Sequence, residues 1–383
     1  MKRRLLTSSF GSLLGSLALG GWSRLARAQS AGVDDNRVVL GQSVAFSGPA
    51  SQLGLQFRLG AQLHFDAVNA KGGINGRLIE MQRLDDGDDP ERCAANTRQF
   101  IQANVFALFG YAGTATSLAA LPLASAAKVP LFAPISGAQA LREPFSRYAI
   151  HVRASYFDET ALIVRHAASV GIRKIAVFHQ NDAYGKSGLN GLQRALQVQS
   201  LAPVAVGTVE RNSIEVAAAL ESILASKSEA IVQIGVYKAC ATFIRLARQQ
   251  GYAGSFYNLS SVGAQALSDE LGAVAKGVVV SQVMPFPYAA VTPLSKDYLA
   301  ALKDLRGVAP NYVGMEGFVA ARVFTEALAR AGRNLTRETF ITAVGSLQNL
   351  NLGGFPLDFG PNKNMGSNFV ELTLLTEDGR VRR

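Results

Sequence analysis

Three segments rich in glycine and in small hydroxyl-bearing side chains stand where predicted strands end, and their chemistry suits the binding of an anion. They occupy residues 45–52, 110–117 and 134–139. In the second segment, Gly113 would let a ligand approach the backbone closely. The peptide N–H groups around Ala115, Thr116 and Ser117 would open a helix and carry partial positive charge, which favours an anion. Capping of that helix by Thr114, Thr116 or Ser117 is the alternative use of the same residues.

The elements that must position these segments alternate along the chain. Runs rich in Val, Ile, Leu and Phe predict strands at residues 38–45, 78–84, 105–109, 129–133, 174–178, 203–207, 230–234, 254–258, 277–283 and 369–375. Stretches with helical spacing separate them, and residues 213–225 are one example, with Ser213 as the expected N-cap. One face of that helix is expected to carry Ile214, Ala217, Leu220 and Leu224.

This alternation predicts an α/β fold in which crossover helices cover both faces of parallel sheets. So many strands in one open sheet would be unusual, so we expect two doubly wound sheets in two lobes. Ligands bind such sheets at the carboxyl ends of their strands. The three segments should therefore meet at one edge and form a ligand site.

Charge argues against a nucleic-acid partner. The 383 residues carry a formal net charge of +10, from 38 Lys and Arg against 28 Asp and Glu. Five of these cations, and no acid, lie within residues 1–28, so the chain without them would carry only +5. Such a charge, spread over the remaining length, makes no electrostatic footprint for nucleic acid. The hydrophobic share of 48% instead predicts a folded protein with a large core.

The first 28 residues have the three parts of a secretory signal. Lys2, Arg3 and Arg4 precede an apolar run at residues 10–22, and a small-x-small sequence ends at Ala28. An apolar run of about a dozen residues is too short to cross the roughly 30 Å hydrocarbon core of a bilayer. We therefore expect cleavage after about Ala28 and a periplasmic protein. Export would use the Sec route or, given the paired arginines, the twin-arginine route.

No set of metal ligands or catalytic groups is complete in this sequence. The acidic run at residues 85–89 lacks the final Glu of a calcium loop and leads into Pro90, so we interpret it as a turn and a helix cap. The histidines show no paired spacing, and no G-x-S-x-G elbow is present. We expect no cofactor, no metal and no enzymatic activity. Cys93 and Cys240 are expected to be free, buried thiols.

Several segments, in order along the chain, together resemble the leucine/isoleucine/valine-binding type of periplasmic solute-binding protein, which serves branched-chain amino acid ABC transporters. They are residues 41–49, 60–62, 68–77, 85–90, 109–117, 129–138, 181–185 and 314–321. The resemblance implies two doubly wound, parallel-sheet lobes joined by a three-crossover hinge. After a signal at residues 1–28, the first lobe would comprise residues 36–153 and 284–366. The second lobe would comprise residues 154–283 and 367–383.

The resemblance also implies how one end of the ligand is held. In the family, the ligand carboxylate is bound by the loop that corresponds to Ala115 and Thr116, together with the loop that corresponds to Ser136, Gly137 and Ala138. The residues alone had already indicated the same two loops. We therefore expect these five residues in the ligand site.

The rest of the implied site closes around the ligand. Tyr184 matches the aromatic residue by which the second lobe covers the ligand, and Leu53 falls where a wall of the side-chain pocket would be. Tyr237 matches a second aromatic residue of that lobe, although Val236 could take that place. Ser260 or Ser261 stands where amino-acid-binding members have an acid that pairs with the ligand ammonium.

This last departure leaves the ligand class open, because a buried ammonium without a carboxylate partner is costly. Two uses of Asp158 and Glu159 stay open: one of them supplies the charge, or both form the acidic first turn of a helix. Arg142 could reach an anionic ligand, or it could form a surface ion pair with an acid such as Glu143. A branched-chain amino acid, an amide, or an aromatic or aliphatic carboxylate all fit the residues.

The sequence thus predicts an extracytoplasmic protein that captures a small carboxylate-bearing ligand between two lobes and delivers it to an ABC permease in the inner membrane. The family expectation is a monomer. Two alternatives stay open at this point. One is a ligand-sensing receptor or amide-responsive regulator of the same fold, and the other is an exported enzyme built on the same lobes.

Overall fold

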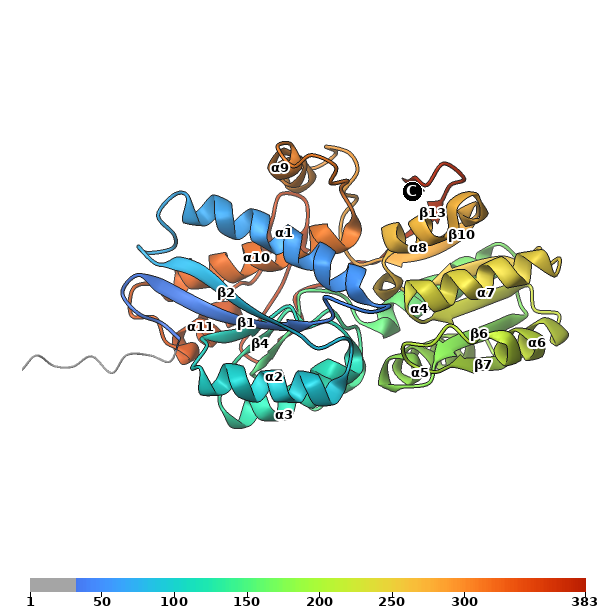
Figure 1. Cartoon of the computed structure of the whole chain (residues 1–383), viewed down its shortest axis with the longest axis horizontal. Helices are drawn as coiled ribbons and strands as arrows, with labels where there is room; N and C mark the ends of the chain where they lie inside the picture. The colour runs from blue at the N-terminus through green and yellow to red at the C-terminus, as the bar shows by residue number, and fades with distance from the viewer. Residues whose placement is uncertain (1–31) are drawn as a thin grey trace, which may run out of the picture.

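The computed structural model describes residues 32–383, and it forms two α/β lobes that lie side by side (Figure 1). The predicted signal at residues 1–28 lies outside the described residues. Each lobe is built on its own sheet, as the alternation of strands and helices predicts. We call the lobe that begins at β1 the first lobe and the lobe that begins at α4 the second lobe.

The first lobe contains a five-stranded, wholly parallel sheet in the order β2-β1-β3-β4-β5. Its strands are β1 (Arg37–Val44), β2 (Leu78–Asp85), β3 (Ala107–Phe109), β4 (Leu131–Phe132) and β5 (Ala149–Ile150). Strands β1 and β2 pair in register from Arg37 opposite Leu78 to Val44 opposite Asp85. A two-stranded ribbon of β11 (Leu350–Asn351) and β12 (Pro356–Leu357) lies outside this sheet.

The second lobe contains a seven-stranded sheet in the order β14-β13-β10-β9-β8-β6-β7. Its strands are β6 (Ile175–Gln180), β7 (Val206–Val209), β8 (Ala230–Ile234), β9 (Ser255–Asn258), β10 (Val278–Gln282), β13 (Glu371–Leu375) and β14 (Val381–Arg382). Strands β6 to β10 run parallel, but β13 and β14 are antiparallel to their neighbours. The expectation of a purely parallel sheet is therefore wrong at this edge, because the chain re-enters the lobe from the opposite direction.

Helices cover the faces of both sheets (Figure 1). The α-helices are α1 (Ser51–Asn69), α2 (Pro90–Gln102), α3 (Thr114–Ala126), α4 (Tyr156–Ser169), α5 (Ala183–Val198), α6 (Ala217–Ala225), α7 (Tyr237–Gln249), α8 (Ala264–Leu271), α9 (Pro293–Leu302), α10 (Tyr312–Ala331) and α11 (Arg337–Gly345). Short 3-10 helices are η1 (Gln139–Leu141), η2 (Ser260–Val262) and η3 (Gly272–Ala275).

The packing of α10 against α1 explains why late residues return to the first lobe. The two helices approach so closely that a Cβ atom on Gly60 would collide with the carbonyl oxygen of Gly314, and one on Gly317 would collide with that of Phe57. Most residues of α10 are buried. The chain therefore passes between the lobes three times, after β5, after β10 and before β13.

Two local predictions, one for the helix at residues 213–225 and one for the two cysteines, can be compared with the structure. The helix expected at residues 213–225 begins at Ala217, and Ser213 does not cap it. The predicted face is wrong in its first half, where Ile214 and Ala217 are exposed, and is confirmed in its second half, where Leu220 is buried and Leu224 packs against the core. Cys93 and Cys240 are both buried and free, as predicted.

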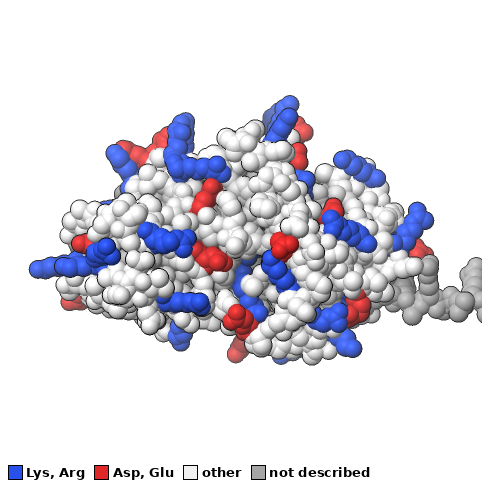
Figure 2. Space-filling view, turned by 180° about the vertical axis from the view of Figure 1, so that it is seen from behind, with Lys and Arg blue, Asp and Glu red and all other residues white. Residues whose placement is uncertain are grey.

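The outer surface mixes charges of both signs. On the face shown in Figure 2, basic and acidic side chains are interspersed among uncharged ones. Among residues 32–383, no helix is both long and apolar enough to cross a bilayer. The same part of the chain holds no group of three or more His, Cys, Asp or Glu side chains placed to bind a metal ion.

Candidate ligand-binding site between the lobes

A small pocket lies between the two lobes, where loops at the carboxyl ends of the strands face each other. From the first lobe it is lined by Ala45, Ala50, Leu53, Asp88, Ala112, Gly113, Thr114, Ala115 and Ile135. From the second lobe it is lined by Tyr156, Gln180, Asp182, Tyr184, Val236 and Ser261. The pocket encloses about 40 Å³, which is little more than the roughly 30 Å³ that one water molecule occupies. A larger ligand can therefore enter only if the lobes move apart.

The N-terminus of α3 opens onto this pocket without a side-chain cap. Its N-cap residue, Gly113, has φ 98 and gives no side-chain cap, and no side chain among residues 32–383 accepts a hydrogen bond from an N–H of the first turn. Thr116 points its hydroxyl backwards and donates to the carbonyl oxygen of Ala112 at 2.5 Å. The alternative that the hydroxyls cap this helix is therefore wrong. The first N–H groups of α3, those of Thr114 and Ala115 among them, remain free for a ligand.

Gly113 is required at this position for two reasons. Its positive φ is one that residues with a side chain rarely adopt. A Cβ atom there would also lie 2.7 Å from Thr116 Oγ1 and 3.0 Å from Asp88 Oδ1. The carboxyl group of Asp88 is thus close to the start of α3, and any larger residue would separate the two.

The loop at residues 136–138 supports the pocket rather than lining it. Ser136 Oγ lies 2.7 Å from Thr114 Oγ1 and accepts a hydrogen bond from Ala138 N at 3.2 Å. Gly137 leaves no room for a Cβ atom, which would press against the ring of Tyr156. Of the five residues predicted to hold the carboxylate, only Ala115 lines the pocket. Thr116, Ser136, Gly137 and Ala138 lie directly behind it.

The second lobe places two aromatic rings in the pocket. Tyr184 follows Asp182, the N-cap of α5, and its ring centroid lies 5.4 Å from that of Tyr156. The side chain of Tyr184 is 7% exposed, and its hydroxyl has no hydrogen-bond partner. Burial raises the pKa of this hydroxyl well above its usual range. A buried, unpartnered hydroxyl is costly, so a polar atom of a ligand would satisfy it.

Tyr237 and Ser260, which were also predicted in the site, are each adjacent in sequence to a residue that lines the pocket. Val236 and Ser261 line it, whereas Tyr237 and Ser260 do not. The hydroxyl of Tyr237 instead interacts with Ser51 at the start of α1. Ser260 faces away and accepts a hydrogen bond from Arg153.

The residues that sequence reasoning missed are Asp88, Gln180 and Asp182. Asp182 caps α5 through Gly185 N, and it also accepts hydrogen bonds from Gln180 Nε2 and Arg211 Nη2, each at 2.7 Å. The sequence does carry a signal for these residues, because each stands where β2 or β6 ends. From the sequence, the acidic run after β2 predicts only a turn and a cap. The cap part of that interpretation is confirmed, since Asp89 accepts from Arg92 N.

Behind the pocket, a buried ion-pair network joins the lobes at the hinge. Arg153, at the first crossover, lies 3.3 Å from Glu159 Oε1 in α4 and 3.3 Å from Glu316 Oε1 in α10. Glu159 Oε2 also accepts hydrogen bonds from Ser260 N at 2.8 Å and from Ser281 Oγ at 2.6 Å. Desolvation raises the pKa of Glu316. Glu159 is fully engaged in this network and does not line the ligand pocket.

The remaining charged candidates have structural positions. Asp158 forms a capping box with Ser155 at the start of α4. Arg142 is only 2% exposed, and within residues 32–383 its guanidinium bonds to backbone carbonyl oxygens and forms no ion pair, so the prediction of a surface salt bridge with Glu143 or another acid is wrong. Its guanidinium donates to backbone carbonyl oxygens on two segments, those of Ser136 and Ala138 and those of Arg153 and Ala154. Burial and the charge of Arg153 lower its pKa to about 10.

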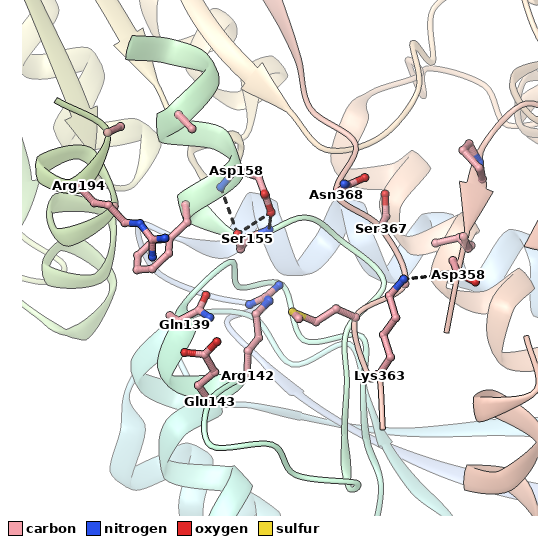
Figure 3. Close-up of a pocket in the computed structure, with 18 of the residues that line it drawn as sticks. Gln139, Arg142, Glu143, Ser155, Asp158, Arg194, Asp358, Lys363, Ser367 and Asn368 are labelled. Carbon is pink, nitrogen blue, oxygen red and sulfur yellow. Dashed lines mark hydrogen bonds and ion pairs between the residues drawn. The ribbon is translucent and has the colours of Figure 1, made fainter. Parts of the chain in front are cut away.

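A second, larger hollow lies on the flank of the hinge (Figure 3). It has a volume of about 820 Å³ and is lined by parts of both lobes, including Arg142, Asp158, Arg194 and Lys363. Several of its lining charges have local partners: Lys363 forms an ion pair with Asp358 at 2.6 Å, and Asp158 forms a capping box with Ser155. It contains none of the nine residues predicted to form the ligand site, although Arg142 and Asp158, which the sequence left open as further ligand contacts, lie on its wall. The smaller pocket between the strand ends is therefore the better candidate site.

Comparisons with known proteins agree with this architecture. A family model described as periplasmic binding protein matches residues 37–379. The Leu/Ile/Val-binding protein homolog 7 of Brucella suis is 24% identical over 327 residues, which cover 82% of this chain and 81% of the relative. The leucine-specific-binding protein of Salmonella typhimurium is 23% identical over 315 residues, which cover 82% of this chain and 84% of the relative.

Solved structures give the same result. A possible leucine/isoleucine/valine-binding protein from Rhodopirellula baltica superposes with a TM-score of 0.84 at 33% identity, covering 90% of this chain and 96% of that one. A substrate-binding periplasmic protein from Ralstonia solanacearum gives a TM-score of 0.85 at 31% identity, covering 90% and 99%. Each of these relatives is named as a binding protein. This chain therefore belongs to the periplasmic binding protein family, in its type I, leucine/isoleucine/valine-binding form.

Proposed function

We propose that this protein captures a small carboxylate-bearing solute between its lobes and delivers it to an ABC importer in the inner membrane. The observation that carries the proposal is the pocket at the strand ends, where the uncapped start of α3 faces the unpartnered hydroxyl of Tyr184. A ligand carboxylate would accept hydrogen bonds from the N–H groups near Ala115. Tyr184, on the opposite lobe, would complete the contacts only when the lobes close.

The mechanism follows from where the binding groups lie. Because the two sets of groups come from different lobes, a bound ligand makes its full set of contacts only in the closed state. Closure is a rotation about the three crossovers, which we place at the boundaries of two lobes. These are residues 36–153 with 284–366, and residues 154–283 with 367–383. The closed shape would be the one that the permease recognises.

The names of the relatives guide the choice of ligand. One is named for leucine, isoleucine and valine, and another for leucine alone, and all three are small α-amino acids. The apolar side chains of Leu53, Ile135 and Val236 in this pocket suit an aliphatic or aromatic side chain of modest size. We further propose export with cleavage after about Ala28, residence in the periplasm and a monomeric state.

The proposal is tested by melting the mature protein in the presence of amino acids, carboxylates and amides. A ligand at several hundred times its Kd should stabilise the protein by roughly 3–4 kcal/mol. Calorimetry is the suitable readout, because the only tryptophan, Trp22, precedes the expected cleavage site. A broad panel in which no solute shifts the melt would contradict a solute-binding function.

A further inference from the structure

Among the residues that line the pocket, the charged ones are all acids. Asp88 and Asp182 contribute carboxyl groups, and no Lys, Arg or His lines the pocket. A ligand with only a negative charge would meet these two carboxyl groups and no positive side chain on the pocket wall. The pocket is therefore poorly matched to a simple carboxylate.

The two acids differ in their partners. Asp182 accepts hydrogen bonds from Arg211, Gln180 and the backbone N–H of Gly185. Within residues 32–383, no hydrogen bond or ion pair ends on the carboxylate oxygens of Asp88, and Arg211 reaches only its backbone carbonyl oxygen. Asp88 is partly buried and is thus the one pocket acid without a partner.

A second polar group in the pocket, the hydroxyl of Tyr184, also lacks the partner that a ligand would supply. The hydroxyl of Tyr184 is buried and has no partner, although the residue is only 7% exposed. Asp88 from the first lobe and Tyr184 from the second line the same small space. A ligand placed between them would contact an acid on one side and a hydroxyl on the other.

We propose that Asp88 selects the ligand by pairing with a protonated nitrogen, so that the solute is an amine-bearing molecule rather than a simple carboxylate. This inference rests on the proposed solute-binding function. It places the partner of the ligand cation in the first lobe, on the loop after β2, in place of the missing acid at Ser260 and Ser261. An amine there would also separate a ligand carboxylate near α3 from the carboxyl group of Asp88.

The environment of Asp88 makes its charge responsive to a bound cation. Desolvation raises its pKa to about 7, and the nearby carboxyl groups of Asp182, Asp86 and Asp89 act in the same direction, while Arg211 opposes them. A cation beside Asp88 would favour its charged form. Affinity for an amine should then fall about tenfold for each pH unit below 7, because a proton competes with the ligand.

The test compares the solute that binds most tightly with its isosteres. Examples are L-leucine, 4-methylpentanoate, which lacks the amine, and 3-methylbutylamine, which lacks the carboxylate. Binding is measured by calorimetry between pH 5.5 and 8.5. We expect the amine-free member to lose at least about 30-fold in affinity. The 3-methylbutylamine arm shows whether the ligand is a zwitterion or an amine alone.

The matched variants are D88N and D304N. Asparagine tolerates the left-handed φ of 60 at residue 88 as well as aspartate does, so D88N should fold, and its melting temperature verifies this. D88N should weaken amine binding at least about 30-fold and abolish the pH dependence. D304N removes an exposed carboxylate outside the pocket and should change neither.

The outcomes separate the two proposals. If the tightest ligand lacks a basic nitrogen, or if D88N binds an amine as well as the wild type does, the role of Asp88 is refuted and the solute-binding function stands. If no solute binds the wild-type protein, the solute-binding function fails, and the role of Asp88 fails with it.

Discussion

Arg211, in the loop before α6 of the second lobe, donates a hydrogen bond from Nη1 to the backbone carbonyl oxygen of Asp88 in the first lobe, at 3.2 Å. Its neighbour Asn212 makes a similar bond to the carbonyl oxygen of Gly87 at 3.4 Å. These bonds join the loop before α6 in the second lobe to the loop after β2 in the first lobe. They form only when the lobes are close together, so they belong to the closed state.

Replacing Arg211 should therefore weaken the closed state. R211A removes the bond to Asp88 and the ion pair with Asp182, so ligand affinity should fall about tenfold, chiefly through faster release. Stopped-flow dissociation and calorimetry would measure this loss. R173A removes an exposed arginine of the same lobe and is the control. An R211A variant with unchanged dissociation would show that these contacts do not hold the lobes together.

Tyr184 offers a test in which stability and binding change in opposite directions. Y184F removes a buried hydroxyl that has no partner, so the ligand-free protein should keep or gain stability, by up to about 1 kcal/mol. Ligand affinity should fall about fivefold or more.

Y257F is the matched control for Y184F, because the hydroxyl of Tyr257 lies 3.0 Å from His166 Nδ1 and outside the pocket. It should lose about 1 kcal/mol of stability and keep its affinity. Chemical unfolding and calorimetry give both quantities for each variant. Equal affinity in Y184F and wild type would remove Tyr184 from the binding site.

The hinge network predicts a large loss of stability when its single cation is removed. R153M leaves Glu159 and Glu316 buried without their partner, which should cost about 3–5 kcal/mol in the free energy of unfolding. Neutralising the acids as well, in R153M/E159Q/E316Q, should recover a large part of this loss. Denaturant unfolding followed by circular dichroism measures both. If the triple variant is as unstable as R153M, an unpaired buried charge is not the cause.

His64 predicts a loss of stability in acid. Desolvation, with the charges of Arg322 and Lys71, lowers its folded-state pKa from 6.5 to about 4. The unfolded chain therefore binds a proton that the folded protein excludes, and stability falls as pH drops from 6.5 to 4, by up to about 3 kcal/mol. H64Q, which can still bond to Thr325, should have a shallower pH profile. An unchanged slope in H64Q would assign the effect to other groups.

The sequence was sufficient to predict the fold and the strand ends that form the site. Periodic apolar runs identify parallel strands well, and glycine with threonine after β3 marks the start of α3. The strand predicted at residues 369–375 is present as β13, but its antiparallel direction was not predicted, because an apolar run does not reveal its direction. The short strand β14 was not predicted. The start of α6 was misplaced, since residues 213–216 have helical spacing but are not helical.

Side-chain direction is what the sequence could not supply within the site. The resemblance preferred Tyr237 but left Val236 open, and it did not decide between Ser260 and Ser261; Val236 and Ser261 line the pocket. A shift of one residue turns a side chain to another face, and only the packed structure decides which face is inward. The burial of Arg142 was missed for a related reason. Its partners are backbone carbonyl oxygens. Because every residue carries one, the sequence gives no sign of which carbonyl groups a buried guanidinium will reach.

The most direct test of the account is a crystal structure of the mature protein with the solute that shifts its melting temperature most. We predict that the solute lies between the lobes, with a polar group on the backbone N–H of Ala115 and another within hydrogen-bond distance of the Tyr184 hydroxyl. A solute bound elsewhere, for instance in the hollow on the flank of the hinge (Figure 3), would contradict the account.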